Sequence, residues 1–588
     1  MLKQWYIRYG EIIVATALLC FYGFHIGGIY GFSIFPDEFT YWAYAAEMSG
    51  YDWSDIISLG SYYSYGYSLI LFPIFVLCQN AVTAYRIAVG FHFLFLFMAF
   101  LFLTQTMKKM TDDKKVLVVL FSALAILFPG NLFYAQLTMT EALLVSLYVI
   151  AGSVLYRYLE SDSLSALFLL MLIWMYLYIV HMRTVGIFMS GILVLLFHIF
   201  WGRGKKSHIP VIVIMTVVLF WGGNVLKDGI LLCMYGGIHR ELAAGNDYSG
   251  QIEKIHYIFT KTGFYDFVIS ILGKILYLGL STYGLFYWGI YTLAKYIAEM
   301  LRNIKKRAAL GIRQQFAFYI GLSAVAQILI ATVYLLTLGE IDDYTYGRYS
   351  ELIIPFIMVF GLTALWEMRP KRILFVTGLL AAVQLTMNVL VVRQIIDTGT
   401  DIFYGYFMTG ISYLYRGEGF EVTRFYTGAY LFGELLTLLV TGAVLFGRSR
   451  PKRQYVFMAL IVLELILATR VTDVYLGPFK KAAFRDSRLA DKIIELQSAD
   501  SSNGRFEIND RNVIYMDGNT RAYIGILQFM ARDTDIQVME RRDAVSDYNG
   551  DITGEDILIF AFDDIFWQEW EEQYVHADTY GHFTILYN

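Results

Sequence analysis

The feature that most constrains this chain is a succession of long apolar stretches, separated by short polar or basic segments. Many of the stretches have roughly 18 to 25 residues, the length that an α-helix needs to cross a bilayer. The chain of 588 residues is 57% hydrophobic and 16% charged, whereas soluble globular proteins carry about 25% charged residues. The sequence therefore predicts an all-α polytopic membrane protein. A net charge of −4 gives no reason to expect nucleic acid as a partner.

A first assignment of these stretches gives about thirteen transmembrane helices. We expect the first of them to be retained, because no small-residue cleavage site follows its basic lead and apolar stretch. One apolar run, Gly66–Leu77, is short for a crossing and contains Pro73, so we interpret it as a half-inserted or interfacial helix. The predicted spans are 10–32, 84–106, 116–131, 142–158, 163–180, 184–201, 209–226, 270–298, 315–337, 351–366, 373–391, 427–446 and 455–473.

The basic loops decide which side of the membrane each span faces. Cytoplasmic loops carry an excess of Lys and Arg, and with a half-inserted helix the basic loops all fall on the side of Lys3 and Arg8. We therefore expect a multi-pass plasma-membrane protein, of bacterial type, with a cytoplasmic N-terminus and an extracytoplasmic C-terminus. The loops that support this topology are 108–115, 201–206, 302–307, 368–372 and 447–453.

The last part of the chain, 474–588, is polar and acidic and contains no cysteine, so it shows no disulfide framework. Runs of strand and helix type alternate in it, which predicts a small α/β domain with parallel strands. We therefore divide the chain into a transmembrane domain, 1–473, and an extracytoplasmic soluble domain with a structural or partner-binding role. The runs are 512–517, 535–540 and 556–562 for strands, and 522–531 for a helix.

Carboxylates stand at two predicted extracytoplasmic membrane edges. Asp37 and Glu38 follow the first span, and Glu141 precedes the span at 142–158. Helix capping is the structural alternative, since an acid in the first turn offsets the helix dipole or completes a capping box. A cap accounts for one carboxylate better than for an adjacent pair, and ionisable residues at a membrane are costly unless they are partnered. These three acids are therefore our candidates for catalytic residues.

Two arginines are predicted on the same side as these acids. Arg183 follows His181 in a turn with almost no loop, and Arg348 stands between Tyr346 and Tyr349. Snorkelling and an interfacial aromatic belt are the structural alternatives. However, basic anchors are less expected outside, and a guanidinium donates paired hydrogen bonds to phosphate. We interpret all five side chains as a phosphate-binding group.

Acids and arginines together fit one kind of chemistry. Carboxylates perform acid–base catalysis, and cations stabilise a departing phosphate. Glycosyl transfer from a lipid-linked sugar phosphate requires both, together with an apolar groove for the lipid.

The ordered set of motifs resembles the membrane-embedded glycosyltransferases of the GT-C type. The nearest branch holds the protein O-mannosyltransferases and the aminoarabinose transferase that modifies lipid A. The Asp-Glu pair and the following Tyr of that branch are matched by Asp37, Glu38 and Tyr41 in "PDEFTYWAYA", and "YYSYGYSLILFPIF" is similar to its Tyr/Pro-rich entry to a short apolar run. The other matches, within roughly 1–475, are Tyr85, Arg86, Pro129, Tyr134, Glu141, Arg183, Gly347, Arg348, Tyr349 and Pro355.

The resemblance implies an inverting transferase that moves a sugar from a polyprenyl-phosphate carrier in the bilayer to an extracytoplasmic glycan, lipid or protein. Asp37 would activate the acceptor hydroxyl, and Tyr41 would position the substrate. Glu38 and Glu141 would position the acceptor or, with Asp37, hold a divalent metal such as Mg²⁺ or Mn²⁺. The chain has no "WWDYG" segment, which argues against the oligosaccharyltransferase branch. Nothing in the sequence identifies the sugar.

Two other classes of function stay open at this point. A transporter or flippase of lipid-linked saccharides would predict charged or broken spans near the bilayer midplane and repeated halves, and the sequence shows neither pattern. A non-catalytic cell-surface scaffold would leave Arg183 and Arg348 without a purpose.

Overall fold

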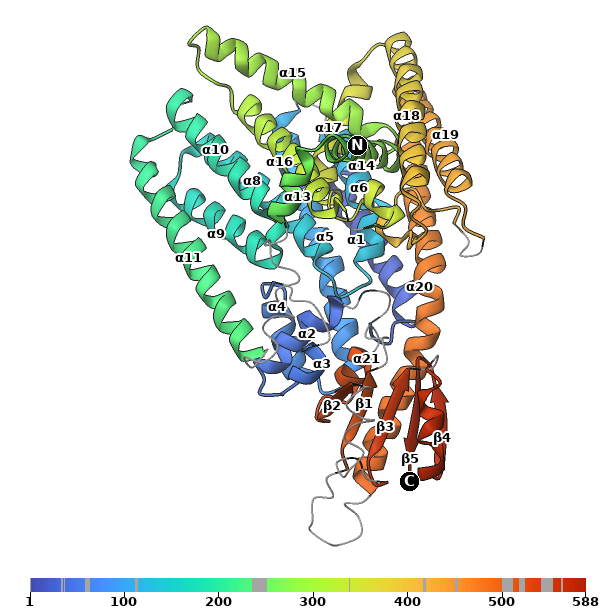
Figure 1. The fold of residues 1–588 in the computed structure, drawn as a ribbon. Helices are drawn as coiled ribbons and strands as arrows, with labels where there is room; N and C mark the ends of the chain where they lie inside the picture. Colours follow the sequence, from blue (N-terminus) through green and yellow to red (C-terminus); the bar gives the residue numbers. More distant parts are fainter. Residues whose placement is uncertain are drawn as a thin grey trace.

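Long helices packed side by side form most of this protein, and a small sheet lies at one end (Figure 1). The computed structural model describes most of the chain, and all statements below concern that part. The described residues are 2–32, 35, 37–58, 64–111, 115–202, 204–234, 251–337, 339–415, 419–449, 453–499, 511–517, 524–540, 552, 554–561 and 564–588.

Ten helices of the described part are long and apolar enough to cross a membrane, which confirms a polytopic helical protein. They comprise α1 (Leu2–Ile26), α5 (Ala81–Met110), α8 (Glu141–Ser161), α10 (Val185–Trp201), α11 (Ile209–Met234), α14 (Lys261–Ser281), α16 (Ile312–Leu335), α18 (Pro370–Thr398), α19 (Val422–Ser449) and α20 (Arg453–Ala499). Shorter helices are α4 (Ser68–Leu77), α6 (Lys115–Ile126), α9 (Leu164–Val180) and α17 (Ile354–Glu367). The total of thirteen spans stays a prediction.

The span predicted at 270–298 was wrong as a single helix. The structure has two helices there, α14 and α15 (Leu285–Lys305), joined by a tight turn. Tyr283 and Gly284 in this turn have φ of 57° and 75°, which end a right-handed helix. The Tyr283 hydroxyl donates to Glu464 Oε2 of α20 at 2.7 Å, so the turn is fixed inside the protein.

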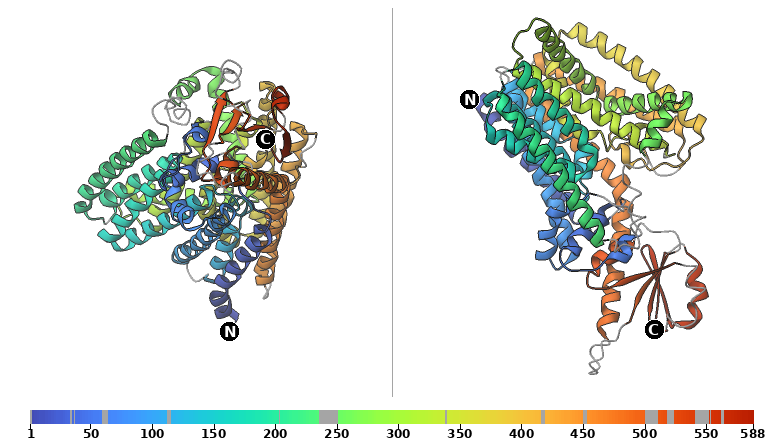
Figure 2. Two further views of the ribbon diagram at one scale, coloured as in Figure 1. Left: turned by 90° about the horizontal axis from the view of Figure 1, so that it is seen from below. Right: turned by 60° about the vertical axis from the view of Figure 1, so that its left-hand side comes forward.

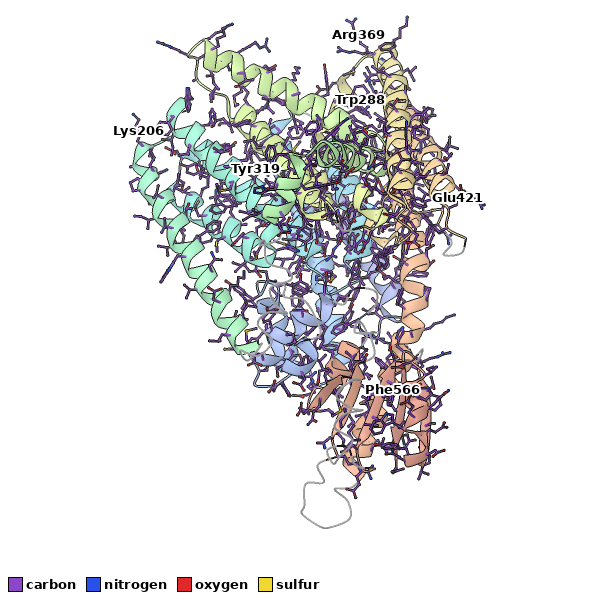
Figure 3. The ribbon with its side chains drawn as sticks, in the orientation of Figure 1. Lys206, Trp288, Tyr319, Arg369, Glu421 and Phe566 are labelled. Carbon is purple, nitrogen blue, oxygen red and sulfur yellow. The ribbon has the colours of Figure 1, made fainter. Side chains whose placement is uncertain are left out.

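The basic loops gather at the end of the molecule that lies opposite the sheet. Figure 3 labels Lys206 and Arg369 at that end and Phe566 of the sheet domain at the other. Arg313 Nη2 donates to the Lys109 carbonyl at 3.2 Å, which ties the start of α16 to the end of α5. This arrangement agrees with the positive-inside assignment, although the side that faces the cytoplasm stays a prediction. Parts of these loops, at 112–114, 203 and 450–452, lie outside the described residues.

Of the short helices between the long ones, α4 and its neighbours α2 (Asp37–Glu47) and α3 (Ser54–Ser58) lie near the sheet end of the helical bundle (Figure 1). The ten residues of α4 are about 15 Å long, half the thickness of the hydrocarbon core, as expected for a half-inserted helix. The other short helices are α7 (Pro129–Tyr134), η1 (Met182–Thr184), η2 (Lys206–His208), α13 (Gln251–Ile258), η4 (Ile341–Thr345), η5 (Glu351–Ile353) and η6 (Tyr406–Met408). Residues 235–250, between α11 and α13, lie outside the described residues.

The C-terminal part forms one five-stranded sheet of order β2-β1-β3-β5-β4. β1 is parallel to both β2 and β3, as predicted, whereas β5 is antiparallel to β3 and β4. The final hairpin was not predicted from the sequence. The elements are β1 (Val513–Asp517), α21 (Ile524–Met530), β2 (Ile536–Glu540), β3 (Ile557–Ala561), η8 (Phe566–Glu569), η9 (Glu571–Gln573), β4 (His576–Tyr580) and β5 (Phe583–Tyr587).

The helix α20 connects the two parts of the molecule without a break. Its 47 residues begin among the transmembrane helices and end beside the sheet, as both views in Figure 2 show. The boundary predicted between 473 and 474 therefore falls inside a continuous helix, and the division into two domains stays a prediction.

The sheet domain packs directly on the short helices of the bundle. The ring of Phe529 in α21 lies 4.9 Å from Trp42 of α2 and 4.8 Å from Phe32, measured between centroids. The buried Arg532 donates to the carbonyls of Phe75 and Cys78 at the end of α4, at 3.1 and 2.8 Å. These contacts hold α2 and α4 against the sheet domain.

Candidate active site

Arg348 is the centre of a buried cluster of charged side chains. Its Nε donates to Glu141 Oε1 at 2.7 Å, and its Nη2 donates to Asp37 Oδ2 at 3.1 Å. Asp37 and Glu141 lie 311 and 207 positions away from Arg348 in the sequence. The structure therefore brings together three of the predicted site residues from the starts of α2 and α8 and from the segment before α17.

Arg183 joins the same cluster from η1, between α9 and α10. Its Nη2 donates to Glu141 Oε1 at 3.1 Å, and only 3% of the residue is exposed. Its Nε and Nη1, and Glu141 Oε2, are buried without a hydrogen-bond partner among the described residues. A buried donor without an acceptor costs about 1–3 kcal/mol, and more when it is charged. The cluster therefore offers two unused guanidinium N–H positions to a ligand.

Aromatic rings surround the two guanidinium groups. The Arg183 guanidinium carbon lies 4.4 Å from the centroid of the Tyr349 ring, and that of Arg348 lies 4.7 Å from the Phe35 ring. Tyr346 stacks on Phe407 with a centroid distance of 4.5 Å. The structure thus places the two predicted tyrosines at the site through their rings, and the role of their hydroxyls as phosphate donors stays a prediction.

His181 lies beside Arg183 and is half-buried. Its Nδ1 accepts the Arg183 backbone N–H at 3.4 Å, and its ring lies 6.0 Å from that of Tyr349. Burial holds the pKa of His181 well below its usual range, and the nearby Arg183 and Arg348 lower it further. The imidazole is therefore neutral, and it can contribute a hydrogen bond to a ligand but no positive charge.

Glu38 is held differently from the other two acids. One of its oxygens, Oε2, accepts from the Tyr85 hydroxyl, from the Thr138 backbone N–H at 2.7 Å and from the Thr138 hydroxyl at 2.8 Å. Trp42 Nε1 also donates to the Thr138 hydroxyl at 3.0 Å. This network joins α2, α5 and the segment before α8, so it fixes the distance between Asp37 and Glu141.

Tyr41 is completely buried one helical turn after Asp37. Its ring meets that of Tyr67 edge-to-face, with 5.4 Å between centroids. Burial raises the pKa of Tyr41 well above its usual value, and Asp37 and Glu141 raise it further. The phenol is therefore a neutral O–H group close to the two carboxylates. Its role in positioning the substrate stays a prediction.

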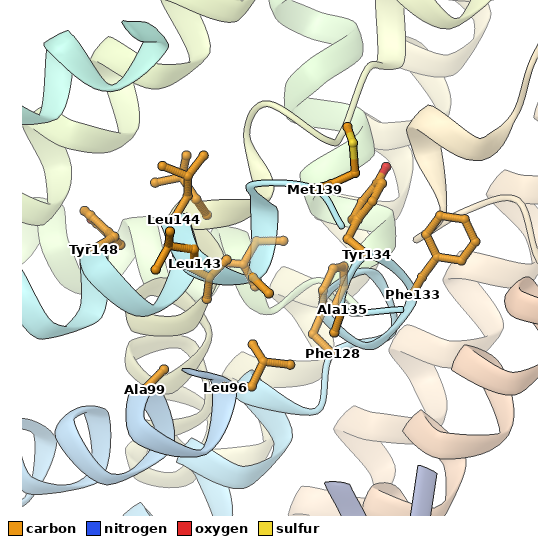
Figure 4. Close-up of a cluster of buried hydrophobic side chains, with 14 of the residues drawn as sticks. Leu96, Ala99, Phe128, Phe133, Tyr134, Ala135, Met139, Leu143, Leu144 and Tyr148 are labelled. Atoms are coloured by element: carbon orange, nitrogen blue, oxygen red, sulfur yellow. The ribbon is translucent and has the colours of Figure 1, made fainter. Parts of the chain in front are cut away.

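A packed apolar cluster supports the segment that carries Glu141. Figure 4 shows Phe128 and Leu143 from this segment close to Leu96 of α5, and Phe133 on the side of Phe128 that is away from Leu96. All four are at most 4% exposed, and α7 begins at Pro129, whose fixed φ suits the first turn of a helix. Close-packed side chains leave the backbone little freedom to move. This cluster therefore holds the start of α8, and with it Glu141, in place.

The backbone on the other side of Arg348 is anchored by a loop and an acid. The Phe407 carbonyl accepts the N–H groups of Gly347 and Arg348 at 2.9 and 3.1 Å. Asp342, which is completely buried, accepts the N–H groups of Tyr404 and Gly405 at 3.3 and 2.7 Å. The segment before Arg348 and the loop that ends in η6 therefore hold each other.

Sequence reasoning missed one buried acid next to this cluster. Glu351, 3% exposed, accepts a hydrogen bond from the Tyr277 hydroxyl of α14, and this hydroxyl also accepts the Gly410 N–H at 3.1 Å. Glu351 stands three positions after Arg348, so its spacing was visible in the sequence. Tyr277 gave no signal, because a tyrosine inside an apolar helix resembles any other core aromatic.

No three Asp, Glu, His or Cys side chains of the described part gather closely enough to hold a metal ion. A Mg²⁺ or Mn²⁺ ion at this site would use the carboxylates of Asp37 and Glu141, and its remaining ligands would be phosphate oxygens and water. Two carboxylates fit this mode of binding, although Arg348 already pairs with both. The metal therefore stays a prediction.

Comparison with protein-family models finds no match for the chain, and neither does comparison with curated proteins. Among solved structures, ArnT from Cupriavidus metallidurans bound to undecaprenyl phosphate matches with a TM-score of 0.52 and 13% identity, over 98% of this chain and 97% of that one. The apo structure of the same ArnT matches with a TM-score of 0.45 and 12% identity, over 98% and 97%. Arabinosyltransferase EmbB from Mycobacterium smegmatis matches with a TM-score of 0.38 and 10% identity, over 79% of this chain and 41% of EmbB.

Only the first of these three similarities is strong enough to support an argument, and at this identity it concerns the fold. It extends over nearly the whole of both chains, so the transmembrane helices and the C-terminal sheet domain are part of one shared architecture. This chain therefore has the GT-C-type fold of ArnT, the fold that its ordered sequence motifs predicted.

Proposed function

We propose that this protein is an integral membrane glycosyltransferase that moves a sugar from a polyprenyl-phosphate carrier to a hydroxyl acceptor. The observation that carries the proposal is the convergence of Asp37, Glu141, Arg183 and Arg348 in one buried cluster. A single buried ion pair occurs in many proteins as a structural element. Here two arginines surround two acids, and two nitrogens of Arg183 have no hydrogen-bond partner among the described residues. This arrangement fits a binding site for an anion.

Asp37 is the group that we assign as the base. It takes the proton of the acceptor hydroxyl, whose oxygen then forms a bond to the anomeric carbon of the sugar. The bond between that carbon and the phosphate oxygen breaks, and its electron pair stays on the phosphate. Because one displacement occurs at the anomeric carbon, the configuration there is inverted.

Arg183 and Arg348 stabilise the charge that develops on the departing phosphate. Arg183 donates through its unused Nε and Nη1, and Arg348 is released in part from Asp37 when the anion enters. The neutral His181 adds one hydrogen bond from its second ring nitrogen. Glu141, which holds both guanidinium groups, keeps their positions during the reaction.

The remaining predicted residues hold the helices and the substrate in position and do not react themselves. Glu38 fixes α2 against α5 through Tyr85 and Thr138, and Tyr41 lines the acceptor side next to Asp37. The apolar α4 borders the path of the lipid tail. The solved ArnT structure with undecaprenyl phosphate supports a carrier of this class, because the two chains share the fold over nearly their whole lengths.

A transfer assay with matched variants tests the proposal. The purified protein, in lipid nanodiscs, receives polyprenyl-phosphate sugars labelled in the sugar, and release of polyprenyl phosphate and labelled product is measured. We expect turnover by the unchanged protein and a loss of about 100-fold or more for Asp37→Asn. Glu47→Gln, at the other end of α2, is the control and should keep full activity.

Each alternative class of function gives a different result in this assay. A transporter or flippase moves the labelled lipid between leaflets without cleavage, and a scaffold shows neither cleavage nor movement. Full activity of Asp37→Asn would remove Asp37 from the role of base. Movement without cleavage, abolished by Arg183→Gln, would replace the transferase proposal by transport.

A further inference from the structure

A cavity of about 1030 Å³ opens at the end of the molecule opposite the sheet. The ends of α5 and α17, the middle of α15 and the starts of α16 and α18 form its walls. The helix α17 begins beside the candidate active site, three residues after Glu351, and ends at Glu367 in the cavity wall. The two sites are therefore separated by one helix length of about 20 Å, so the cavity does not belong to the catalytic cluster.

The walls of this cavity carry mainly positive charge. Five cationic side chains line it, against the two acids Glu299 and Glu367. The cations come from different helices, since Lys295 belongs to α15 and the others to the starts of α16 and α18. The cationic side chains are Lys295, Arg313, Arg369, Lys371 and Arg372.

A positive-inside anchor requires basic residues at this membrane edge, but it does not require them to converge on a hollow. Lys371 and Arg372 stand in the first turn of α18, where the helix dipole disfavours cations. Five cations against two acids in one lining also leave a net positive charge that repels itself. An anion in the cavity would remove both costs.

Several contacts hold the walls in place before any ligand binds. Arg313 donates to the Lys109 carbonyl at 3.2 Å, and Arg448 donates to the Met368 carbonyl at 2.6 Å. The Arg372 guanidinium carbon lies 5.8 Å from the centroid of the Tyr291 ring. These contacts fix the positions of the helix segments that form the cavity.

The surroundings of the cavity indicate a lipid rather than a soluble anion. Phe375 stands one helical turn after Lys371 on α18 and is 74% exposed, and Leu374 is 59% exposed. Exposed apolar side chains on a membrane helix face lipid chains. Basic side chains at the head of a cavity and apolar side chains directly beyond it match a charged headgroup and its acyl chains.

We propose that this cavity binds the phosphodiester headgroup of an anionic phospholipid from the leaflet at this end of the protein. Basic pockets between transmembrane helices bind such headgroups through several Lys and Arg at once. Arg313, Arg369 and Arg372 supply paired donors to the phosphate oxygens, and Lys295 and Lys371 supply point charges. The tyrosines in the wall add neutral donors for the glycerol part.

Binding is tested on the detergent-purified full chain with three probes: phosphatidylglycerol, phosphatidylcholine and inorganic phosphate. Native mass spectrometry counts bound lipid, and a thermal-shift assay measures stabilisation. We expect phosphatidylglycerol alone to bind and to raise the melting temperature. The double variant Lys371→Ala/Arg372→Ala should bind it about tenfold or more weakly, because each cation near an anionic lipid contributes to binding.

The matched control removes the same charge from the same end of the protein, outside the cavity. Arg302→Ala/Lys305→Ala changes two exposed residues at the end of α15 that do not line it. This control should bind phosphatidylglycerol as the unchanged protein does, whereas Lys295→Ala, on α15 within the cavity, should weaken binding. Equal losses in control and cavity variants would overturn the proposal in favour of general surface charge. Equal binding of phosphatidylcholine, or stabilisation by inorganic phosphate alone, would overturn it as well.

Discussion

Asp37 Oδ2 and Arg348 Nη2 lie 3.1 Å apart in a buried ion pair, although 311 positions separate the two residues in the chain. The base that we assign and the cation that we assign to the phosphate are thus each other's partner before substrate binds. An entering phosphate competes with Asp37 for Arg348. In the proposed reaction, binding of the donor would therefore free the carboxylate that the acceptor hydroxyl needs.

Arg348→Lys should reduce turnover more than Arg183→Lys does. Arg348 bridges two carboxylates through two different nitrogens, and one ammonium group cannot reproduce this fork. Arg183 pairs with Glu141 through one nitrogen, so Lys keeps that contact and loses mainly donors to phosphate. Steady-state kinetics should show a lower kcat for Arg348→Lys and a raised donor KM for Arg183→Lys. The same change in both parameters for the two variants would contradict the separate roles.

Glu38→Gln and Tyr85→Phe should each lower the free energy of unfolding by about 1–3 kcal/mol. The first variant replaces a carboxylate that accepts three hydrogen bonds, and the second removes one of its donors. Thermal unfolding in detergent checks this effect. The control is Tyr455→Phe, an exposed tyrosine on α20, which should change stability little. If Glu38→Gln keeps full stability but loses all turnover, Glu38 reacts with substrate instead of positioning α2.

The segment 340–345 should become less stable as the pH rises. Burial, together with the nearby Asp343, raises the pKa of Glu340 to about 7. Burial also raises the pKa of Asp343 to about 6, although hydrogen bonding to the Glu340 N–H opposes this. Because both folded pKa values lie above the unfolded ones, the stabilisation present at low pH is lost between about pH 4 and pH 7.

Hydrogen-exchange protection of 340–346, corrected for intrinsic rates, measures this loss. Asp343→Asn should flatten the part of the pH dependence near pH 6, since the amide does not titrate. Asp397→Asn, an exposed partner of Arg393 on α18, is the control and should leave the profile unchanged. Protection that rises with pH in the unchanged protein would contradict the assignment.

Arg532→Met should loosen α4. The variant removes two charge-assisted hydrogen bonds to the last carbonyls of that helix, which are worth about 1.5–3 kcal/mol each. Exchange at 68–78 should become faster by mass spectrometry, and turnover should fall if α4 borders the lipid path. Arg488→Met removes an exposed i,i+3 pair on α20 and should leave both unchanged.

Much of the helical architecture was predictable, because spans follow from length and apolar character alone. The convergence of the basic loops followed from the positive-inside rule, and the first three strands followed from their apolar runs. The break at Tyr283 was not predictable, since a two-residue turn inside an apolar stretch leaves its hydropathy unchanged. The strand β4, "HADTY", was missed because its residues are half or fully exposed and show no apolar run.

The candidate site was predictable as a set of residues but not as a network. The types and order of Asp37, Glu141, Arg183 and Arg348 pointed to phosphate chemistry. Their pairing depends on how α2 and α8 face the segment before α17, which no local pattern encodes. The contact of Tyr277 with Glu351 could not be predicted for the same reason, because the two residues are 74 positions apart and meet only through the packing of helices.

The uninterrupted course of α20 sets a limit on how this chain can change. At about 1.5 Å per residue its 47 residues measure roughly 70 Å. Near the C-terminal end of α20, Asp486 accepts the His582 backbone N–H at 2.9 Å and so binds the final hairpin. In the same sheet domain, Arg532 donates to a carbonyl at the end of α4. One inserted residue before Asp486 would turn everything beyond it by about 100° and carry Arg532 away from its carbonyls. Substitutions can accumulate along this helix, but insertions and deletions cannot, so the number of its residues matters to the structure as much as any side chain does.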